Sequence, residues 1–232
     1  MKYAIVFSAL GLVCAVYGAS VGPLGLRVLF ASLAVCWLGV GFAYAGAGGR
    51  LFGKRREGRL RWWSAAFWPF HLLNYALLGA FRRSKKENAF DLIDDNVLLG
   101  CQLRARDEAE LAPRQVRAVL DLTCEFAEAP FLRRLNYRSI PLLDTHAPTL
   151  EQLREGADFL VQNAAFGPVY VHCALGHGRS ALFVAAYLLQ SGQAKTADEA
   201  IGLIRAKRPR IGLHPGQRAV LERFVDAQNS AP

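Results

Sequence analysis

The chain begins with two long apolar segments. No charged residue occurs in residues 3–21, and Arg27 is the only charged residue in residues 22–49. Each segment is long enough to cross a bilayer as a helix, and Pro23 lies in a turn between them. The pattern predicts a transmembrane helical hairpin over residues 1–48.

A basic stretch follows the second apolar segment, with Glu57 as its only acid. Its cations are Arg50, Lys54, Arg55, Arg56, Arg59 and Arg61. The positive-inside tendency places this stretch, and therefore the N-terminus, in the cytoplasm. An alternative is that the first segment is a signal peptide, whose removal would leave a single anchor and the same location for the rest. Either way we expect a membrane protein, multi-pass in the first case, whose remaining part faces the cytoplasm.

A third apolar stretch covers residues 62–81 and is rich in tryptophan. Arginines precede it, and Arg82, Arg83, Lys85 and Lys86 follow it. Cations on both sides favour an interfacial helix over a crossing one, with the basic clusters on anionic headgroups. A third spanning helix, or a helix packed on the soluble domain, are the alternatives. We assign residues 49–90 to a basic juxtamembrane and interfacial segment.

The remaining part, residues 91–232, has the composition of an ordinary soluble domain. Short runs with β-like composition alternate there with segments of helical periodicity, which indicates an α/β sheet with helical layers. The expected strands are residues 96–99, 117–123, 137–142 and 168–172.

Helix starts in this domain are marked by capping residues. Thr149 with Gln152, and Thr196 with Glu199, have capping-box spacing, and Pro215 is suited to open the last helix.

Composition and charge narrow the functional classes. The hydrophobic content of 53% agrees with a membrane part, and the net charge of +9 comes from cations beside apolar segments. The expected partner of these cations is therefore a membrane with anionic headgroups, and no nucleic acid is expected. Five cysteines without regular spacing indicate neither a disulfide framework nor a zinc site, so we expect no metal and no cofactor.

A strand, a glycine-containing loop and a helix N-terminus follow one another between residues 168 and 189. Backbone N–H groups of such a loop turn inward around an anion, and the helix dipole adds positive potential. Arg179 can hold two phosphate oxygens at once. The loop residues that we expect around the phosphate are His172, Ala174, Leu175, Gly176, His177 and Gly178.

Cys173 is the expected nucleophile, because the same positive field lowers the pKa of its thiol. Ser180 is placed to hydrogen-bond the sulfur, and His172 is expected to orient the loop through backbone hydrogen bonds. A leaving alkoxide also needs a proton donor, for which Asp144, after the strand ending near residue 142, is the best candidate. We interpret Asp121 and Cys124 as structural.

The segment His172-Cys-Ala-Leu-Gly-His-Gly-Arg-Ser180 resembles the loop of the dual-specificity branch of the protein tyrosine phosphatase superfamily. The similarity extends over most of the soluble part, and residues 169–173, 185–190 and 215–224 are most similar to mitochondrial-type phosphatidylglycerophosphate phosphatases. The resemblance implies a dual-specificity-phosphatase-like sheet with helical layers, hydrolysis through a phosphocysteine, and an acid-bearing loop at the position of Asp144.

The resemblance implies a phosphorylated lipid as the substrate, such as phosphatidylglycerophosphate. The loop interior is neutral, with Ala174, Leu175 and His177 where phosphatases of strongly anionic phospholipids often carry lysine or arginine, so the lipid prediction depends on the membrane part. One alternative is a protein tyrosine or dual-specificity phosphatase acting on a membrane-proximal phosphoprotein. An alternative of another class is a non-catalytic membrane-bound phosphate-binding scaffold, against which the intact Cys173, Arg179 and Asp144 argue.

Overall fold

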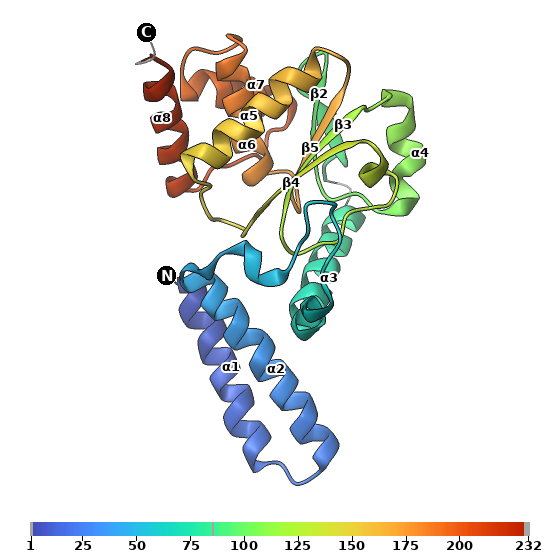
Figure 1. The fold of residues 1–232 in the computed structure, drawn as a ribbon, viewed down its shortest axis with the longest axis vertical. Coiled ribbons are helices and arrows are strands. Elements are labelled where there is room, and N and C mark those ends of the chain that lie inside the picture. Colours follow the sequence, from blue (N-terminus) through green and yellow to red (C-terminus); the bar gives the residue numbers. More distant parts are fainter. Residues whose placement is uncertain (1, 85, 230–232) are drawn as a thin grey trace.

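The two apolar segments form an antiparallel helical hairpin, α1 (Lys2–Ser20) and α2 (Leu24–Phe42), which projects from the rest of the molecule (Figure 1). Both helices are long and apolar enough to cross a membrane, by length and composition. Small residues allow them to approach closely: a Cβ atom added to Gly11 would lie 2.7 Å from Cγ of Leu38. The computed structural model describes residues 2–84 and 86–229, so Lys85 of the second basic cluster lies outside the described residues.

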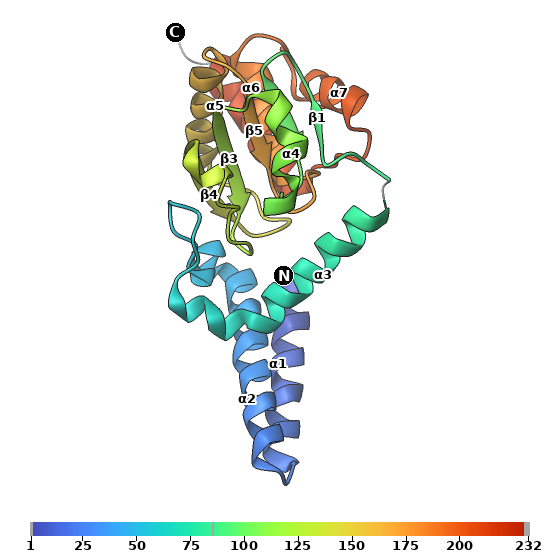
Figure 2. The same ribbon diagram turned by 90° about the vertical axis from the view of Figure 1, so that its right-hand side faces the viewer.

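The segment after the hairpin consists of short helical turns and one longer helix. Its elements are η1 (Ala43–Ala47), η2 (Gly49–Phe52), η3 (Trp62–Phe67) and α3 (Trp68–Ser84), and an isolated bridge from Lys54 to Leu60 closes a turn between η2 and η3. Figure 2 shows α3 running across the end of the hairpin, beneath the α/β domain. Phe70 packs with residues of the hairpin, whereas Leu78 packs with residues of the α/β domain. The helix therefore touches both parts, and its interfacial position remains a prediction.

The α/β domain is built on a five-stranded sheet of order β1-β2-β5-β3-β4. The strands are β1 (Phe90–Leu92), β2 (Val97–Gly100), β3 (Ala118–Thr123), β4 (Asn136–Leu142) and β5 (Val169–His172). Strands β2, β5, β3 and β4 are parallel, and β1 pairs antiparallel with β2. The predicted α/β fold is confirmed; β1 was missed because three residues are too few to show a periodic pattern.

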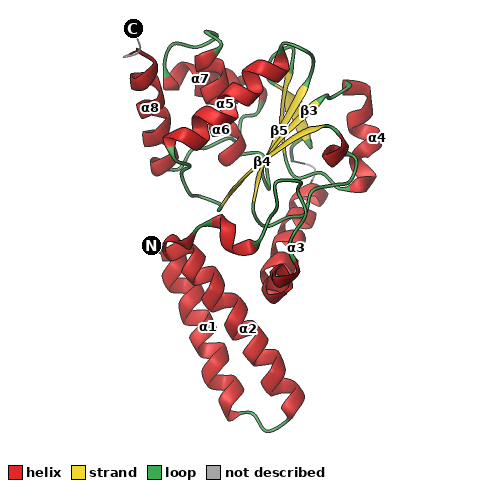
Figure 3. Cartoon of the chain, viewed as in Figure 1, coloured by secondary structure: helices red, strands yellow, loops and turns green. Residues whose placement is uncertain are grey.

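Helices cover both faces of the sheet (Figure 3). They are α4 (Glu108–Leu111), α5 (Leu150–Ala164), α6 (Arg179–Gln190), α7 (Ala197–Lys207) and α8 (Pro215–Asn229), with the short turns η4 (Ala105–Asp107), η5 (Ala112–Arg114) and η6 (Leu132–Arg134). Helices α5 to α8 pack in one apolar core, and α4 and the end of α3 pack on the opposite face. The central strands are buried on both faces, as is usual for parallel sheets.

The predicted helix starts are largely confirmed. Thr149 and Gln152 form the reciprocal capping box, and Pro215 opens α8. At Thr196 only half of the box forms, because the Glu199 carboxylate accepts a hydrogen bond from the N–H of Lys195 and not from that of Thr196.

A third apolar cluster joins the hairpin to the α/β domain. Its central members are fully or almost fully buried: Cys36, Val40, Ala43, Phe52, Phe67, Phe70, Cys124 and Leu143. Cys124 and Leu143 are the immediate neighbours of Glu125 and Asp144 in the sequence. The end of the hairpin is therefore packed directly beneath the predicted site.

Candidate active site

The predicted strand, loop and helix lie where the sequence pattern places them, with β5 ending at His172 and α6 beginning at Arg179. Gly176 has a φ of +78°, and a Cβ atom there would lie 2.6 Å from the carbonyl of Gly100. Only glycine fits this position without strain. Its N–H points inward and donates a hydrogen bond to Cys173 Sγ at 3.3 Å.

The Cys173 thiol lies at the centre of the loop and is buried. Burial raises the pKa of Cys173, but the charge of Arg179 and hydrogen bonds from Ser180 outweigh it, so the pKa lies below its ordinary value. The Ser180 hydroxyl donates to the sulfur at 3.3 Å. The thiolate is therefore favoured, and Ser180 contacts the sulfur as predicted.

Arg179 is held by a carboxylate that the sequence reasoning missed. The two terminal nitrogens of its guanidinium donate to the two carboxylate oxygens of Glu125 at 3.0 and 2.7 Å, and one also donates to the carbonyl of Leu142 at 2.9 Å. Both side chains of the pair are buried. Arg179 Nε is buried without a hydrogen-bond partner among the described residues, which leaves one donor for a ligand oxygen.

Glu125 lies two residues after the end of β3, beyond the carboxyl end of a parallel strand. Ligand sites of open α/β sheets gather at these ends, so its position in the sequence was the available signal. Burial raises the pKa of Glu125, but the positive charge of Arg179 lowers it by more. The pKa of Glu125 therefore lies below its ordinary value.

Asp144 lies at the rim of the same site. Its carboxylate is 3.4 Å from Arg179 Nη2, and its side chain is 66% exposed. The following residues hold its loop in place: Thr145 has a φ of +64°, and His146 packs its ring on Tyr44 of η1 and accepts a hydrogen bond from Gln217 through its carbonyl. Asp144 is thus placed beside Arg179 by a loop anchored to both the hairpin end and α8.

A cavity of about 220 Å³ contains these groups. Cys173, Arg179, Asp144 and Glu125 line it together with loop residues Ala174, Leu175, His177 and Gly178. Its wall also includes Asn74, Leu77 and Leu78 of α3. Helix α3 therefore forms part of the wall of the cavity that contains the predicted catalytic loop.

The predicted backbone contact of His172 is present, but a carboxylate lies closer to its ring. Its Nδ1 is 3.4 Å from the carbonyl of Cys173, a long backbone contact, whereas its Nε2 lies 2.6 Å from the Glu128 carboxylate. Burial lowers the pKa of His172, but the carboxylates of Glu128 and Asp121 raise it more, so its pKa is above the ordinary value. A carboxylate, and not the backbone, is the principal partner that orients this ring.

Asp121 is buried at the centre of a second ionic group. The ammonium of Lys54 contacts its carboxylate and lies 2.6 Å from Thr123 Oγ1, and Asp121 Oδ1 is 3.9 Å from His172 Nε2. Asp121, Glu128 and His172 have donor atoms close enough together to hold a metal ion. Because Lys54 already brings a cation to Asp121, we interpret the group as an ion-pair network.

The loop backbone is held from outside by Arg208, which the sequence reasoning also missed. Arg208 is 1% exposed and donates to the carbonyls of Gly176 at 2.9 Å and Leu175 at 3.0 Å. Its guanidinium also pairs with Asp91 of β1 at 2.6 Å. At the rim, His177 lines the cavity, as predicted, but its Nε2 is bound to Glu87 at 2.6 Å.

We expect Glu125→Gln to lower the free energy of unfolding by about 3–5 kcal/mol, because it leaves the buried Arg179 charge without its counter-ion. Chemical denaturation of the full chain in neutral detergent measures this. The matched control is Glu155→Gln, which breaks the half-exposed pair with Arg138 and should change the value by at most about 1 kcal/mol. Equal effects of the two substitutions would contradict the structural role of Glu125.

Comparison with known proteins gives consistent matches. Residues 97–226 match the family described as dual specificity phosphatase, catalytic domain. Phosphatidylglycerophosphate phosphatase PTPMT2 of Arabidopsis thaliana is 29% identical over 194 residues, covering 81% of this chain and 77% of that protein. The human phosphatidylglycerophosphatase and protein-tyrosine phosphatase 1 is 36% identical over 57% of this chain and 71% of that protein.

Solved structures show the same similarity. The crystal structure of PTPMT1 in complex with PI(5)P superimposes with a TM-score of 0.56 at 29% identity, covering 62% of this chain and 100% of that one. The active form of Tk-PTP gives a TM-score of 0.53 at 26% identity, covering 60% of this chain and 97% of that one. The family match spans the catalytic loop, Glu125 and Asp144.

Proposed function

This chain belongs to the dual specificity phosphatase family, and on that premise we propose that it is a membrane-anchored phosphatase of a glycerophospholipid phosphate such as phosphatidylglycerophosphate. Family membership makes it an enzyme that hydrolyses phosphate monoesters. The resemblance to mitochondrial-type phosphatidylglycerophosphate phosphatases that the sequence indicated is confirmed by the relatives.

The observation that carries the lipid proposal is the position of α3. This helix contributes the exposed Leu77 and the buried Leu78 to the wall of the catalytic cavity, and it also exposes Leu72, Leu73 and Trp68. A phosphate bound in the loop would thus have an apolar helix beside it. A phospholipid fits this arrangement, with its phosphate at Cys173 and its acyl chains remaining in the bilayer along α3.

The hairpin supports a membrane location for this site. Both helices expose large apolar side chains along most of their length, among them Val13, Val16 and Val28. We propose that residues 1–48 span the membrane, residues 49–90 lie at its surface and residues 91–232 form the catalytic domain in the cytoplasm. The close packing of α1 on α2 at Gly11 and Gly18 favours retention of α1 over its removal as a signal peptide.

In the proposed reaction the Cys173 thiolate attacks phosphorus while Asp144 gives its proton to the leaving glycerol oxygen. The P–O bond breaks as the S–P bond forms, which yields a phosphocysteine and the dephosphorylated lipid. The Asp144 carboxylate then takes a proton from a water molecule that attacks phosphorus and releases phosphate. Arg179 and the loop amides bear the charge of the transferring group, and Ser180 stabilises the departing sulfur.

A protein phosphatase is the second candidate function. The neutral loop interior at Ala174 and Leu175 carries no lysine or arginine for a strongly anionic headgroup. The human relative is named as a protein-tyrosine phosphatase as well as a phosphatidylglycerophosphatase. The intact set of Cys173, Arg179 and Asp144 argues against a non-catalytic scaffold.

We expect the full-length protein, in mixed micelles, to hydrolyse phosphatidylglycerophosphate with a kcat/KM at least about 100-fold above that for phosphotyrosine peptides. The lipid reaches the entrance along α3, which a soluble peptide does not use. The measurement is phosphate release under identical micelle conditions, with phosphoinositides as a third substrate. A preference for the peptides would overturn the lipid proposal.

Introducing a charge on the exposed face of α3 further tests whether the enzyme is a lipid phosphatase or a protein phosphatase. Leu72→Glu should raise KM for the lipid in micelles and leave hydrolysis of a water-soluble aryl phosphate unchanged, because Leu72 is 61% exposed and does not line the cavity. The matched control is Leu203→Glu on α7, a leucine that is 43% exposed. Equal KM values for the two variants would argue against α3 as the lipid-contacting helix.

A further inference from the structure

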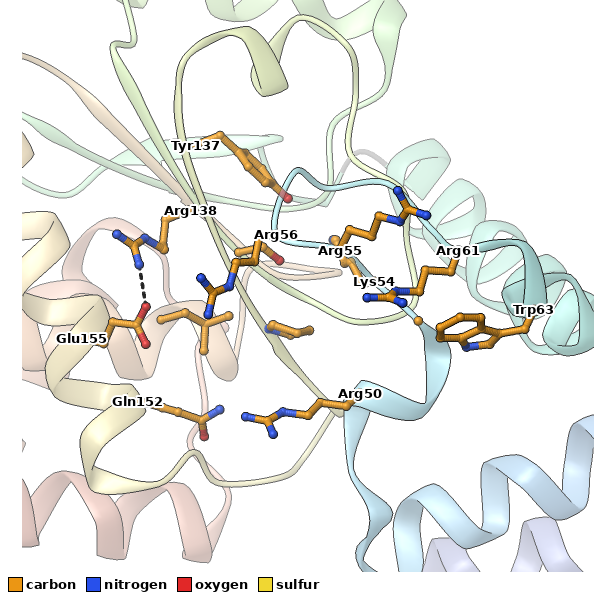
Figure 4. A pocket seen from close by; sticks show the side chains of 14 residues that line it. Arg50, Lys54, Arg55, Arg56, Arg61, Trp63, Tyr137, Arg138, Gln152 and Glu155 are labelled. Atoms are coloured by element: carbon orange, nitrogen blue, oxygen red, sulfur yellow. Dashed lines mark hydrogen bonds and ion pairs between the residues drawn. The ribbon is translucent and has the colours of Figure 1, made fainter.

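A second and larger cavity, of about 880 Å³, lies between the segment of residues 50–63 and the catalytic domain (Figure 4). Its volume falls within the range of roughly 300–1,000 Å³ that is usual for small-molecule sites. Its walls on the catalytic domain are β4 and the start of α5. The basic residues that line it are Arg50, Lys54, Arg55, Arg56, Arg61 and Arg138.

The positive charge of this cavity is largely uncompensated. Glu155 is the only acid among the described residues that line it, and it is already paired with Arg138 at 2.8 Å. Arg50 and Arg56 have no ion-pair partner in residues 2–84 and 86–229. Figure 4 shows both side chains extending toward Gln152 and Glu155. Like charges that converge on one hollow repel one another unless an anion lies between them.

The location of the cavity indicates where that anion comes from. Arg50 lies in η2, three residues after the end of η1, which directly continues the second apolar helix. Trp63, an aromatic residue of the type that is enriched at membrane surfaces, also lines the cavity, with the Arg61 guanidinium 4.8 Å from its ring. With the hairpin in a bilayer, Arg50 and Trp63 would lie close to the membrane surface.

From this arrangement we infer that the arginine-lined cavity is a second, non-catalytic site, which binds the phosphodiester headgroup of an anionic phospholipid. The inference rests on the membrane position proposed above. Arg50 and Arg56 supply charge-assisted hydrogen bonds to the phosphate oxygens, and Gln152 supplies an amide for the remainder of the headgroup. A phosphodiester has no terminal phosphoryl group for Cys173 to remove, so this lipid is a ligand and not a substrate.

The site is connected to the catalytic loop through the turn that carries Arg55 and Arg56. At one end of the turn, Lys54 contacts Asp121; near the other, the carbonyl of Gly58 accepts a hydrogen bond from the N–H of Glu128 at 2.8 Å. Asp121 and Glu128 are the two acids beside His172, the residue before the nucleophile. A headgroup that orders this turn therefore also orders the acids that hold His172.

The test is equilibrium binding of fluorescent phosphatidylglycerol to the full-length Cys173→Ser protein in neutral detergent micelles, read by energy transfer from its tryptophans. The Cys173→Ser background separates binding from turnover, and the substitutions at Arg50 and Arg56 separate this cavity from product binding at the catalytic loop. We expect saturable binding that the double variant Arg50→Gln with Arg56→Gln weakens at least about tenfold, because two charge-assisted hydrogen bonds are lost.

The control is the double variant Arg114→Gln with Arg223→Gln, which removes the same charge from two exposed positions away from the cavity and should bind like the parent. Soluble glycerophosphoglycerol should compete only at far higher concentration than the lipid, and phosphatidylcholine should not compete. Equal binding by the two double variants would overturn the site. Competition by phosphatidylcholine, or by the free headgroup at the concentration of the lipid, would overturn its assignment to an anionic phospholipid.

Discussion

Replacing Cys173 by serine should lower kcat by at least about 10⁴-fold on both phosphatidylglycerophosphate and a generic aryl phosphate. The loop lowers the pKa of the Cys173 thiol, so the parent holds the nucleophile as an anion, whereas a serine hydroxyl stays protonated. The smaller oxygen still accepts the hydrogen bonds that Ser180 and Gly176 give to the sulfur. Turnover should therefore be lost while the fold is retained, as measured by steady-state kinetics together with thermal unfolding.

The control for this substitution is Cys101→Ser, which changes another buried cysteine that does not line the catalytic cavity. Its activity should remain within a few-fold of the parent. Chelators should leave the parent unaffected, because no step of the proposed reaction uses a metal. If Cys173→Ser kept more than about a hundredth of the parent kcat, the phosphocysteine mechanism would be wrong.

Asp144→Asn should have the second largest effect, and its size should depend on the leaving group. A glycerol alkoxide needs a proton as it leaves, so kcat on the lipid should fall by about 10²–10⁴-fold. When the aryl phosphate is a nitrophenyl phosphate, its leaving nitrophenolate is stable without a proton. The decrease in kcat on that substrate should therefore be much smaller. In both proteins activity should rise with pH through the pKa of Cys173, because the thiolate is the reactive form. In the variant this increase in activity should occur at lower pH. The reason is that the negative charge of Asp144 raises the pKa of Cys173 in the parent.

Kinetics on the two substrates side by side measure this difference. Asp158→Asn is the matched control, since Asp158 lies on α5 and accepts a hydrogen bond from Gln190 instead of facing the cavity. Its kcat should match the parent on both substrates. A loss at Asp144 of the same size on both leaving groups would assign that residue to positioning Arg179 and not to proton transfer.

The catalytic loop could be predicted because its determinants are local in sequence. The shape of the loop and its positive electrostatic potential depend on features within residues 168–189, namely a buried strand, two glycines and a helix N-terminus. The partners of this loop are not local. Glu125 reaches Arg179 across 54 positions of sequence, and Arg208 reaches Gly176 across 32. No periodic pattern reports such pairs, because they depend on how the strands and helices are arranged.

Lys54 is a second case in which the partner of a side chain could not be predicted from the sequence pattern. In the sequence it is one cation in a run of arginines, and such runs are usually solvated. In the structure its side chain is fully buried against Asp121. Similarly, Arg82 belongs to the second predicted lipid-binding cluster, yet it pairs with Asp107 of the catalytic domain at 2.8 Å. The pattern of charges along the sequence could not distinguish cations that face lipid from cations that form ion pairs within the protein.

The apolar cluster around Phe52 and Phe70 joins the hairpin and the catalytic domain without a flexible tether. With the hairpin in a bilayer, the active site has a fixed height and orientation above that bilayer. The active site of such an enzyme cannot contact a neighbouring vesicle or a substrate far out in solution. It meets its substrate by diffusion in the plane of its own membrane. Its velocity should therefore follow the mole fraction of substrate in the membrane and hardly depend on the total lipid in the sample.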